Sequence, residues 1–255
     1  MSWKLSVKKN FVAKEPVFIE GLPGIGNVGK VVVDYLIEKL NAKKIGSLFS
    51  YDLPNSVFVN SKNLVQLPSI DLFHVVIKNK DFLFLTGDAQ PSTERASYEL
   101  SETIISFLDG LATKEIITLG GIGLEEIPDK PKVFVTGNNK SLIKELSVVG
   151  ANKKIFGIVG PIVGVSGLLL GLTKIPAGAL LVETFAHPMY IGLKEAKELM
   201  KVISKKYSFK IDYKDLDEEI SLVEEELETS KTKNDKNKKV RYGKTRLNKD
   251  LHYIG

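Results

Sequence analysis

The clearest structural pattern in the sequence lies near the N-terminus, where Val17-Phe18-Ile19 is followed by Gly21-Leu22-Pro23-Gly24-Ile25-Gly26-Asn27-Val28-Gly29. The three apolar residues predict a short buried strand, and the glycine-rich segment after them predicts a tight turn. Apolar residues then recur at helical spacing, which predicts a helix from about Asn27 to Leu40. A strand, a turn and a helix in this order are typical of α/β proteins.

Strand-like and helix-like segments continue to alternate along most of the chain. Further strands are predicted at 45–51, 57–59, 64–67, 115–119, 133–135, 155–159 and 179–185, and helices at 93–111, 141–146, 193–205 and after Pro161. His74 to Ile77 and Phe82 to Leu85 flank a polar turn and predict a hairpin. We therefore expect residues 1–212 to form one α/β domain, with a mainly parallel mixed sheet and helices on both faces.

The character of the sequence changes after residue 212. Residues 213–229 are rich in acidic side chains and predict an acidic amphipathic helix. Its apolar stripe consists of Leu216, Ile220, Val223 and Leu227. Residues 230–255 predict a flexible basic tail, because Thr229 to Lys239 is polar throughout and cannot bury enough apolar surface to offset its ordering entropy. Lys231 to Arg246 holds eight basic residues and one acidic residue, so the total charge of +5 leaves −2 for the rest of the chain.

Composition and charge argue against several classes of protein. The chain has no cysteine, which excludes disulfides and thiolate chemistry and fits the cytoplasm, the location we expect. Ile155 to Leu172 carries no charge and approaches the length of a membrane span, but its five glycines and Pro161 favour a turn followed by a buried helix. The excess of basic over acidic residues lies in the tail, with only Tyr242 among the basic residues there, so nucleic acid is the least favoured partner.

Three glycine-rich segments supply candidate binding residues. Gly24 to Gly29 has the spacing of a dinucleotide-binding loop, whose amide groups bind phosphate at a helix N-terminus. Pro23 and the lack of an acidic residue at the end of the next strand favour a purely structural turn instead. Gly120 to Gly123 and Gly160 to Gly164 are also expected to follow strands, which would place all three turns on one rim of the sheet. The candidate residual pocket on this rim comprises Gly24, Gly26, Asn27, Gly29, Asp88, Gln90, Gly121 and Gly160.

The rim lacks a recognisable set of catalytic side chains. Ser166 misses the spacing of a nucleophile elbow by one residue, and the sequence has no Walker loop for ATP. The three histidines are isolated in the sequence and predict no metal site. We therefore predict no catalytic, cofactor-binding or metal-binding residues and a protein that is not an enzyme. The alternative is a small-molecule-binding protein or an enzyme that takes a nucleoside or phosphate at the rim.

Six segments occur in an order that matches a known family. They are Gly21 to Gly29, Gly87-Asp88-Ala89-Gln90-Pro91, Leu119-Gly120-Gly121, Gly160-Pro161-Ile162-Val163-Gly164-Val165-Ser166-Gly167-Leu168-Leu169-Leu170, Leu181-Val182-Glu183-Thr184-Phe185 and Pro188-Met189-Tyr190. Together they resemble the proteasome assembly chaperone family in its archaeal, homo-oligomeric form, over roughly residues 15–205. The resemblance implies a three-layer α/β/α domain similar to nucleoside-phosphorylase-like folds, without their catalytic apparatus and with no cofactor.

The resemblance also implies a function. Such factors are ATP-independent proteasome assembly chaperones that form homo-oligomers and bind α-ring subunits of the core particle. A C-terminal tail can insert between neighbouring α subunits through a hydrophobic–Tyr–any motif, and here Tyr253 stands third from the end. The predicted partner-binding residues are Leu251, His252, Tyr253, Ile254 and Gly255. Several tails displayed by one oligomer would bind the ring multivalently.

Overall fold

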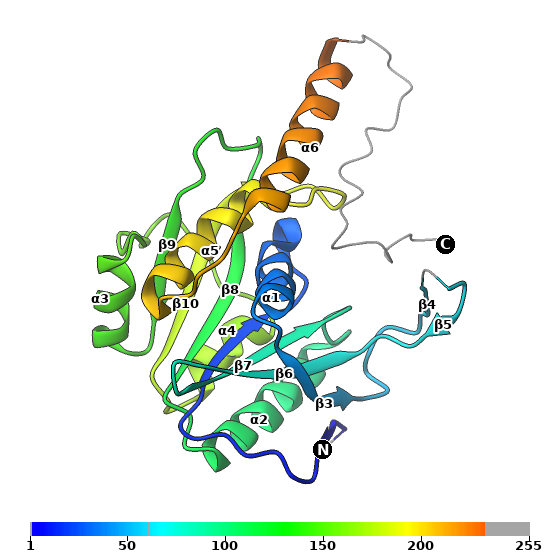
Figure 1. Ribbon diagram of the computed structural model, residues 1–255, viewed down its shortest axis with the longest axis vertical. Coiled ribbons are helices and arrows are strands. Elements are labelled where there is room, and N and C mark those ends of the chain that lie inside the picture. The colour runs from blue at the N-terminus through cyan, green and yellow to red at the C-terminus, as the bar shows by residue number, and fades with distance from the viewer. Residues whose placement is uncertain (1, 61, 233–255) are drawn as a thin grey trace.

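The computed structural model describes residues 2–60 and 62–232, which form a large sheet with helices on both faces (Figure 1). The strands of this sheet are β1 (Lys4–Val7), β2 (Val17–Gly21), β3 (Lys43–Phe49), β6 (Ile70–Ile77), β7 (Lys80–Gly87), β8 (Glu115–Leu124), β9 (Val133–Gly137) and β10 (Ala177–Phe185). Their order across the sheet is β1-β3-β6-β7-β2-β8-β10-β9. Two short strands, β4 (Phe58–Val59) and β5 (Val65–Gln66), pair with each other in a separate hairpin.

The sheet is parallel at its centre and antiparallel at its flanks. β2 pairs in parallel with β7 and β8, and β8 pairs in parallel with β10. β6 and β7 form the predicted hairpin, and β1–β3, β3–β6 and β9–β10 are antiparallel as well. The predicted mixed sheet is confirmed, although its flanks contain more antiparallel pairs than the single hairpin that the sequence indicates.

Helices cover the two faces of the sheet unequally. The helices are the short 3₁₀ turn η1 (Ile25–Asn27), α1 (Val28–Lys39), α2 (Glu94–Gly110), α3 (Lys140–Val148), α4 (Val165–Leu172), α5 (Leu193–Tyr207) and α6 (Lys214–Thr232). Buried residues of α1, α3, α5 and α6 share one apolar core with the sheet, and those of α2 and α4 share another on the opposite face. This arrangement confirms the three-layer α/β/α domain.

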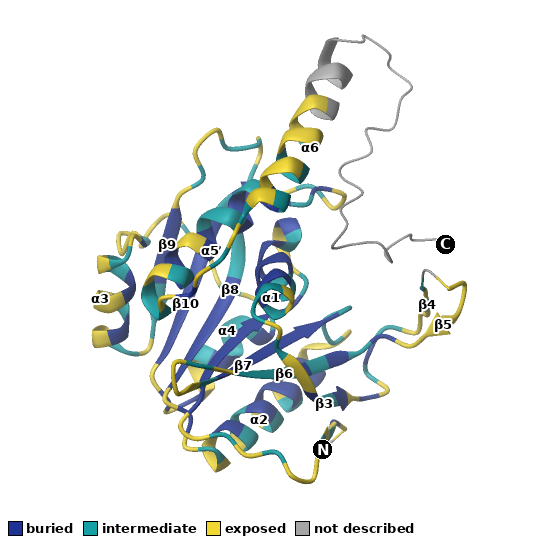
Figure 2. Ribbon diagram, in the orientation of Figure 1, coloured by how far each residue is buried: buried dark blue, intermediate teal, exposed yellow. Residues whose placement is uncertain are grey.

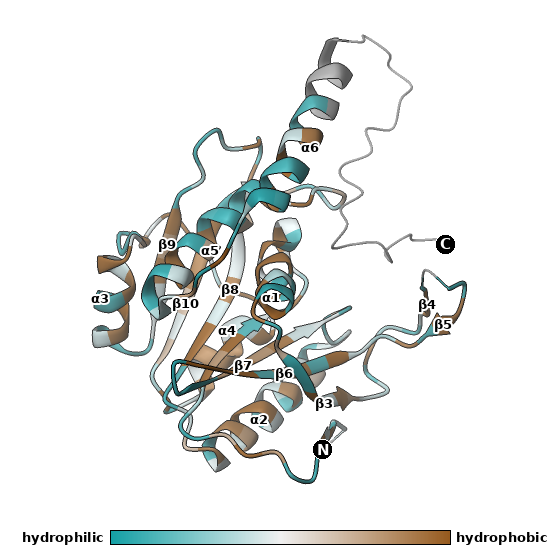
Figure 3. Cartoon of the chain, viewed as in Figure 1, coloured by the Kyte–Doolittle hydropathy of each residue, from teal (hydrophilic) through white to brown (hydrophobic). Residues whose placement is uncertain are grey.

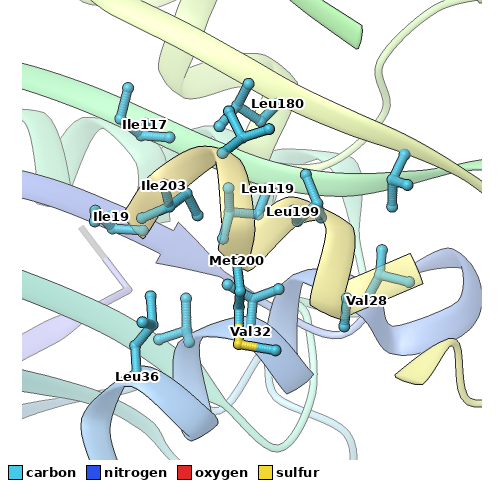
Figure 4. Packing of buried hydrophobic residues seen from close by; sticks show 14 of the residues in the cluster. Ile19, Val28, Val32, Leu36, Ile117, Leu119, Leu180, Leu199, Met200 and Ile203 are labelled. Carbon is cyan, nitrogen blue, oxygen red and sulfur yellow. The ribbon is translucent and has the colours of Figure 1, made fainter. Parts of the chain in front are cut away.

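The alternation of side chains along the central strands builds both cores. In β2, Ile19 faces the core under α1 and α5, whereas its neighbour Phe18 faces the core under α2 and α4, and both are fully buried. Figure 4 shows Met200 of α5 beside Val32 of α1 in the first core. A strand that is buried on both faces needs a continuous apolar run, which explains the clear signal at the start of β2. Figure 2 shows the central strands in the colour of buried residues.

Three segments differ from the prediction. β1 is absent from it, because this short strand is held by contacts with segments remote in the sequence, namely its pairing with β3, the docking of Trp3 and the hydrogen bonds of Ser2 with Glu99. The indole Nε1 of Trp3 donates a hydrogen bond to the carbonyl of Ala96 in α2 over 2.9 Å. Residues 155–159 form a turn and not the predicted strand, and Ile155 packs against the outer strands. Gly120 to Gly123 lies inside β8 and not in a turn after it.

The predicted acidic helix forms as α6. Its first turns pack on the domain, with Leu216 buried and Ile220 and Val223 partly buried against the core. The tail is predicted to begin at residue 230, but residues 230–232 are the last of α6, and the rest of the predicted tail, from residue 233 on, lies outside the described residues. Only the last eight residues of the uncharged stretch Ile155 to Leu172 are helical, as α4. None of the helices described is both long enough and apolar enough to cross a membrane.

Candidate functional site

The carboxyl ends of the parallel strands meet at one edge of the sheet, where α/β proteins place their sites. The loop after β2, the loop after β7 and the start of α4 come together there through Gln90. Its side-chain Nε2 donates to the carbonyl of Pro23 over 2.7 Å, and its Oε1 accepts from the amide of Val165 over 3.4 Å. Gly164 has a φ of 84°, and a Cβ at this position would lie 2.5 Å from the Gln90 Oε1. Three of the six segments that carry the family resemblance, those that contain Pro23, Gln90 and Gly164, therefore contact one another.

Glu20 lies beneath this junction, on the central strand β2, and is fully buried. Its Oε1 accepts hydrogen bonds from the amide of Leu22 over 2.9 Å and from the Oγ of Ser166 over 3.1 Å. Burial raises the pKa of this carboxyl from 4.5 to about 7, against the opposing effect of the two hydrogen bonds. Ser166 is thus a partner of Glu20 that holds α4 on the sheet, and its position shows no sign of a nucleophile elbow.

The residues next to Glu20 leave part of its hydrogen-bonding capacity unused. Its Oε2 has no partner among the described residues, and neither has the Oγ1 of Thr118. Thr118 lies opposite Glu20 in the register of β2 and β8 and is also fully buried. A carboxyl group in such a place is more stable with a proton, because the charged form would have to be desolvated. We infer that the neutral form prevails well into the pH range where a surface glutamate is ionised.

The glycine loop after β2 is used for close packing. A Cβ at Gly29 would lie 2.6 Å from the carbonyl oxygen of Leu119 in β8, and one at Gly121 would lie 2.4 Å from the carbonyl oxygen of Ile25. Gly26 and Asn27 both have positive φ, 62° and 51°, which turns the chain sharply into α1. These contacts favour the interpretation of Gly24 to Gly29 as a tight turn that packs against the sheet over its interpretation as a nucleotide-binding loop.

A small cavity does open beside this loop. It encloses about 220 Å³ and is lined by Gly24, Ile25, Gly26, Asn27, Ala186, His187, Pro188 and Tyr190. Pockets for small-molecule ligands usually measure about 300–1,000 Å³. The cavity lies below this range, which weakens the alternative of a protein that binds a nucleoside there.

A second buried carboxyl supports the wall of the cavity. Glu195 of α5 is fully buried, and its Oε1 accepts from the hydroxyl of Tyr190 over 2.8 Å and from the Oγ1 of Thr184 over 3.4 Å. Burial raises the pKa of Glu195, and burial together with the nearby Glu195 raises the pKa of Tyr190. The loop before α5 is tied to η1, because the amide of Gly192 donates to the carbonyl of Gly26 over 2.9 Å. These bonds fix the cavity wall.

The structure brings together some of the predicted pocket residues and separates others. Gly24, Gly26 and Asn27 line the cavity. Gly29, Gly121 and Gln90 do not line it and instead pack against Leu119, Ile25 and Pro23, respectively. Asp88 instead lies at the open end of the β6–β7 hairpin, away from its turn, where the Oδ2 of Asp88 accepts a hydrogen bond from the amide of Ser69 over 2.9 Å. Gly160 follows a turn and not a strand, and nothing lies within 4 Å of its Cβ position. The expected rim of three glycine turns is therefore wrong for Gly120 to Gly123 and for Gly160.

Two functional features were not predicted from the sequence. Glu20 interrupts the apolar run of β2, and an acidic residue inside a strand that is buried on both faces is a signal that could have been read. Glu195 lies in a helix with many charged residues, so nothing in the sequence distinguishes it. The predicted partner-binding residues, from Leu251 to Gly255, lie outside the described residues. No group of three or more potential metal ligands clusters within residues 2–60 and 62–232.

The domain has an α/β/α fold, and its glycine loops contact one another at the carboxyl edge of the parallel strands. In this class of scaffold, loops of the protein itself occupy most of the edge where other α/β proteins bind a ligand. The PAC2 family matches residues 18–230, and the chain belongs to this family. PbaB of Pyrococcus furiosus, described as an archaeal proteasome activator, is a similar solved structure. It is 30 % identical with a TM-score of 0.83, and the match covers 90 % of this chain and 99 % of PbaB.

Two further relatives extend the comparison. PbaA of Pyrococcus furiosus, described as an archaeal homolog of proteasome-assembly chaperone, is 23 % identical with a TM-score of 0.76, over 91 % of this chain and 92 % of PbaA. An uncharacterized protein of Methanocaldococcus jannaschii is 29 % identical over 94 % of this chain and 92 % of its own length. The likeness therefore extends over nearly the whole chain in both comparisons.

Substitution of Gly29 by alanine tests the packing role of the motif. The new methyl group would collide with the main chain of Leu119, so we expect Gly29→Ala to lower the free energy of unfolding by about 1–3 kcal/mol. Gly110→Ala, at the end of α2 where nothing lies within 4 Å, is the matched control and should leave stability unchanged or raise it by up to about 1 kcal/mol. Urea denaturation of both variants measures the difference. Equal stability of the two would contradict the packing role.

The raised pKa of Glu20 predicts how stability depends on pH. The folded protein holds this proton up to about pH 7, whereas the unfolded chain releases it near pH 4.5. Stability should therefore fall as the pH rises from about 4.5 to 7, by about 3 kcal/mol at 1.36 kcal/mol per pH unit, and the loss should be complete above pH 7. In Glu20→Gln this contribution should be absent, whereas that of Glu195, whose pKa is also raised by burial, remains, so that the variant gains on the wild type as the pH rises.

The measurement is the free energy of unfolding at pH 5 and pH 8 for the wild type and the variant. Glu102→Gln, at an exposed position of α2, serves as the control and should follow the wild-type profile. If Glu20→Gln and the wild type lose the same free energy between the two pH values, the buried carboxyl does not hold its proton as described.

Proposed function

We propose that this protein is an ATP-independent proteasome assembly chaperone that acts in the cytoplasm and is not an enzyme. The observation that carries the proposal is the interlocking of the motif segments through Gln90 and Glu20, which uses the glycine loops for internal packing. Membership of the PAC2 family and the likeness to PbaA and PbaB support a role connected with the proteasome. In this proposal the domain is a rigid platform, and recognition takes place at its periphery.

The partner in this proposal is the α ring of the proteasome core particle, bound by the C-terminal tails of a homo-oligomer. The described chain ends on α6, which projects from the body of the domain (Figure 1). The base of α6 is fixed on α5 by ion pairs of Lys194 with Glu224, at 3.0 Å, and of Lys197 with Asp217. Figure 3 colours most of the described residues of α6 as hydrophilic. The projecting helix would direct each tail away from the sheet.

The length of the remaining chain is compatible with docking at a distance. The 23 residues after Thr232 could span up to roughly 80 Å when fully extended, at 3.3–3.6 Å per residue. Their basic residues would be attracted to an acidic protein surface, and the segment from Leu251 to Gly255 would supply the apolar anchor. Tethering several weak anchors to one body raises their effective concentration at a ring of repeated sites.

Deletion of residues 247–255 tests the tail mechanism. We expect the truncated protein to keep the oligomeric mass of the wild type but to lose at least ten-fold in affinity for proteasome α subunits from the same organism, because the loss of several anchors is multiplied in a multivalent complex. Bio-layer interferometry measures the affinity, and light scattering measures the oligomeric mass. A variant with residues 247–255 in scrambled order is the control for length and charge. Undiminished affinity of the truncated protein would rule out the tail as the anchor.

A second function, activation of the assembled proteasome, is favoured by one observation. The chain is more similar to PbaB, described as a proteasome activator, than to PbaA, in both identity and TM-score. The two functions predict different results in one pair of assays. An assembly chaperone should increase the yield of core particle from separate subunits, whereas an activator should raise peptide hydrolysis by particles that are already assembled. Both should proceed without ATP.

A further inference from the structure

An extension of the chain separates two strands that lie side by side in the sheet. β3 ends at Phe49 and β6 begins at Ile70, and these strands are antiparallel neighbours with Leu48 opposite Ile70. A turn of two to five residues is enough to join such strands. The chain instead uses 20 residues, most of which project beyond the end of the sheet (Figure 1). We call residues 50–60 and 62–69 the arm.

The arm is built as a hairpin with an apolar surface. Its strands β4 and β5 share only two pairs of residues, and the turn between them is ordered by Asn60, whose Oδ1 accepts from the amides of Lys62 and Leu64. Figure 2 colours most of this hairpin as exposed. The large apolar side chains that its hairpin exposes, by 51–68 %, are Val57, Val59, Leu64, Val65 and Leu67, and Tyr51 at the root of the arm is exposed by 96 %. An isolated two-stranded hairpin is at best marginally stable in water, so the arm requires a surface to pack on.

The charge of the arm restricts what that surface can be. Asp52 and Lys62 are its only charged residues, so its net charge is zero. A neutral apolar arm gains nothing from nucleic acid or from a strongly charged protein face. The surface that it fits is apolar and uncharged.

Such a surface exists on the same chain, at the opposite end of the sheet. The uncharged stretch 155–172 folds back on itself, so closely that a Cβ at Gly167 would lie 2.0 Å from the carbonyl oxygen of Ile162. Its inner residues pack on β8, β9 and β10, and its outer apolar residues are exposed by 42–103 %. These outer residues, which we call the α4 patch, are Phe156, Ile158, Val163 and Leu172. The root of the arm lies near α4, but its β4–β5 hairpin projects away from α4 on the β3 side of the sheet, so we expect the hairpin not to dock on the patch of its own copy (Figure 1).

We propose that the arm of one copy docks on the α4 patch of the next copy. Joining two different surfaces of identical chains gives a head-to-tail contact, which closes into a ring when the rotation between copies allows it. This contact deepens the proposed function, because it supplies the oligomer on which multivalent tails depend. The proposal of this contact is argued from the exposed residues of the arm and the α4 patch, and it does not depend on the C-terminal tails.

The area of the two surfaces is sufficient for such a contact. At 25 cal/mol per Å² and 1.5–3 kcal/mol per buried aliphatic side chain, the arm offers about 300 Å² of apolar surface. The patch, which contains a fully exposed phenylalanine, offers about 350 Å². With the polar third that interfaces usually contain, their contact would bury about 1,000 Å² in total, the lower limit of a specific interface. Each copy would make two such contacts in a closed ring.

Charged substitutions on either surface test the contact. We expect the wild type to be an oligomer and both Val65→Glu, on the arm, and Phe156→Glu, on the patch, to have the mass of a single chain in sedimentation experiments. Val148→Glu, at an exposed position of α3 outside both surfaces, is the matched control and should keep the mass of the wild type. A wild type that is monomeric, or either variant with the wild-type mass, would overturn the proposal.

A mixture of the two variants distinguishes this contact from an arm-to-arm contact. In a head-to-tail arrangement the intact arm of Phe156→Glu can still dock on the intact patch of Val65→Glu, so the mixture should form dimers and nothing larger. An arm-to-arm contact would leave Phe156→Glu associated on its own and would yield no new species on mixing. The chain has no cysteine, so the double variant Val65→Cys with Phe156→Cys gives a second measurement. Oxidation should link its copies into a ladder, whereas the single variants Val65→Cys and Phe156→Cys should form no ladder.

These measurements read mass and cross-linking only. A positive tail-deletion result with a negative result here would leave the proposed function intact and place the oligomer contact elsewhere. The reverse outcome would establish the contact and remove the tail from the mechanism.

Discussion

The close approach of α1 to the central strands is the constraint on which the rest of this structure depends. A Cβ at Gly21 would lie 2.2 Å from the carbonyl oxygen of Gly29, and Gly29 in turn touches the main chain of β8. Only glycine allows main chains to come so close. Because α1 begins against the sheet, Leu22 and Pro23 are held over Glu20 and beside Gln90, and α4 can be fastened to both. A bulkier residue at these positions would separate the layers and loosen the rim.

The sequence predicts the layers of this domain well because the central strands are buried on both faces. Runs such as Val17-Phe18-Ile19 are typical of strands that are buried on both faces, and the helical stripes of α1, α2 and α5 follow directly from the spacing of their apolar residues. The candidate site was less predictable. Gly24 to Gly29 indicates a turn before a helix, but whether its amides are free for a ligand depends on β8, which is remote in the sequence. The turn at 155–159 has the apolar pattern of a strand because its side chains pack on the sheet without joining it.

A rim that is filled from within changes where recognition can occur. In many α/β enzymes the carboxyl edge of the strands is left open for a substrate, and flanking loops supply the reacting groups. Here the corresponding loops bind each other, and the buried carboxyls of Glu20 and Glu195 are spent on fastening α4 and the loop before α5. The exposed features that remain are peripheral, namely the projecting α6, the arm and the α4 patch. These peripheral features are suited to contact other proteins.

The docking of Trp3 has a consequence for how folding of this protein can be followed. Trp3 is the only tryptophan in the chain, and 93 residues separate it from its hydrogen-bond partner Ala96. β1 pairs with β3 and Trp3 docks on α2, so the native surroundings of the indole require both elements. Indole emission, excited apart from tyrosine, therefore reports the assembly of the N-terminal strand with the core under α2 and α4, to which Trp3 belongs, and carries no direct signal from the core under α1 and α5.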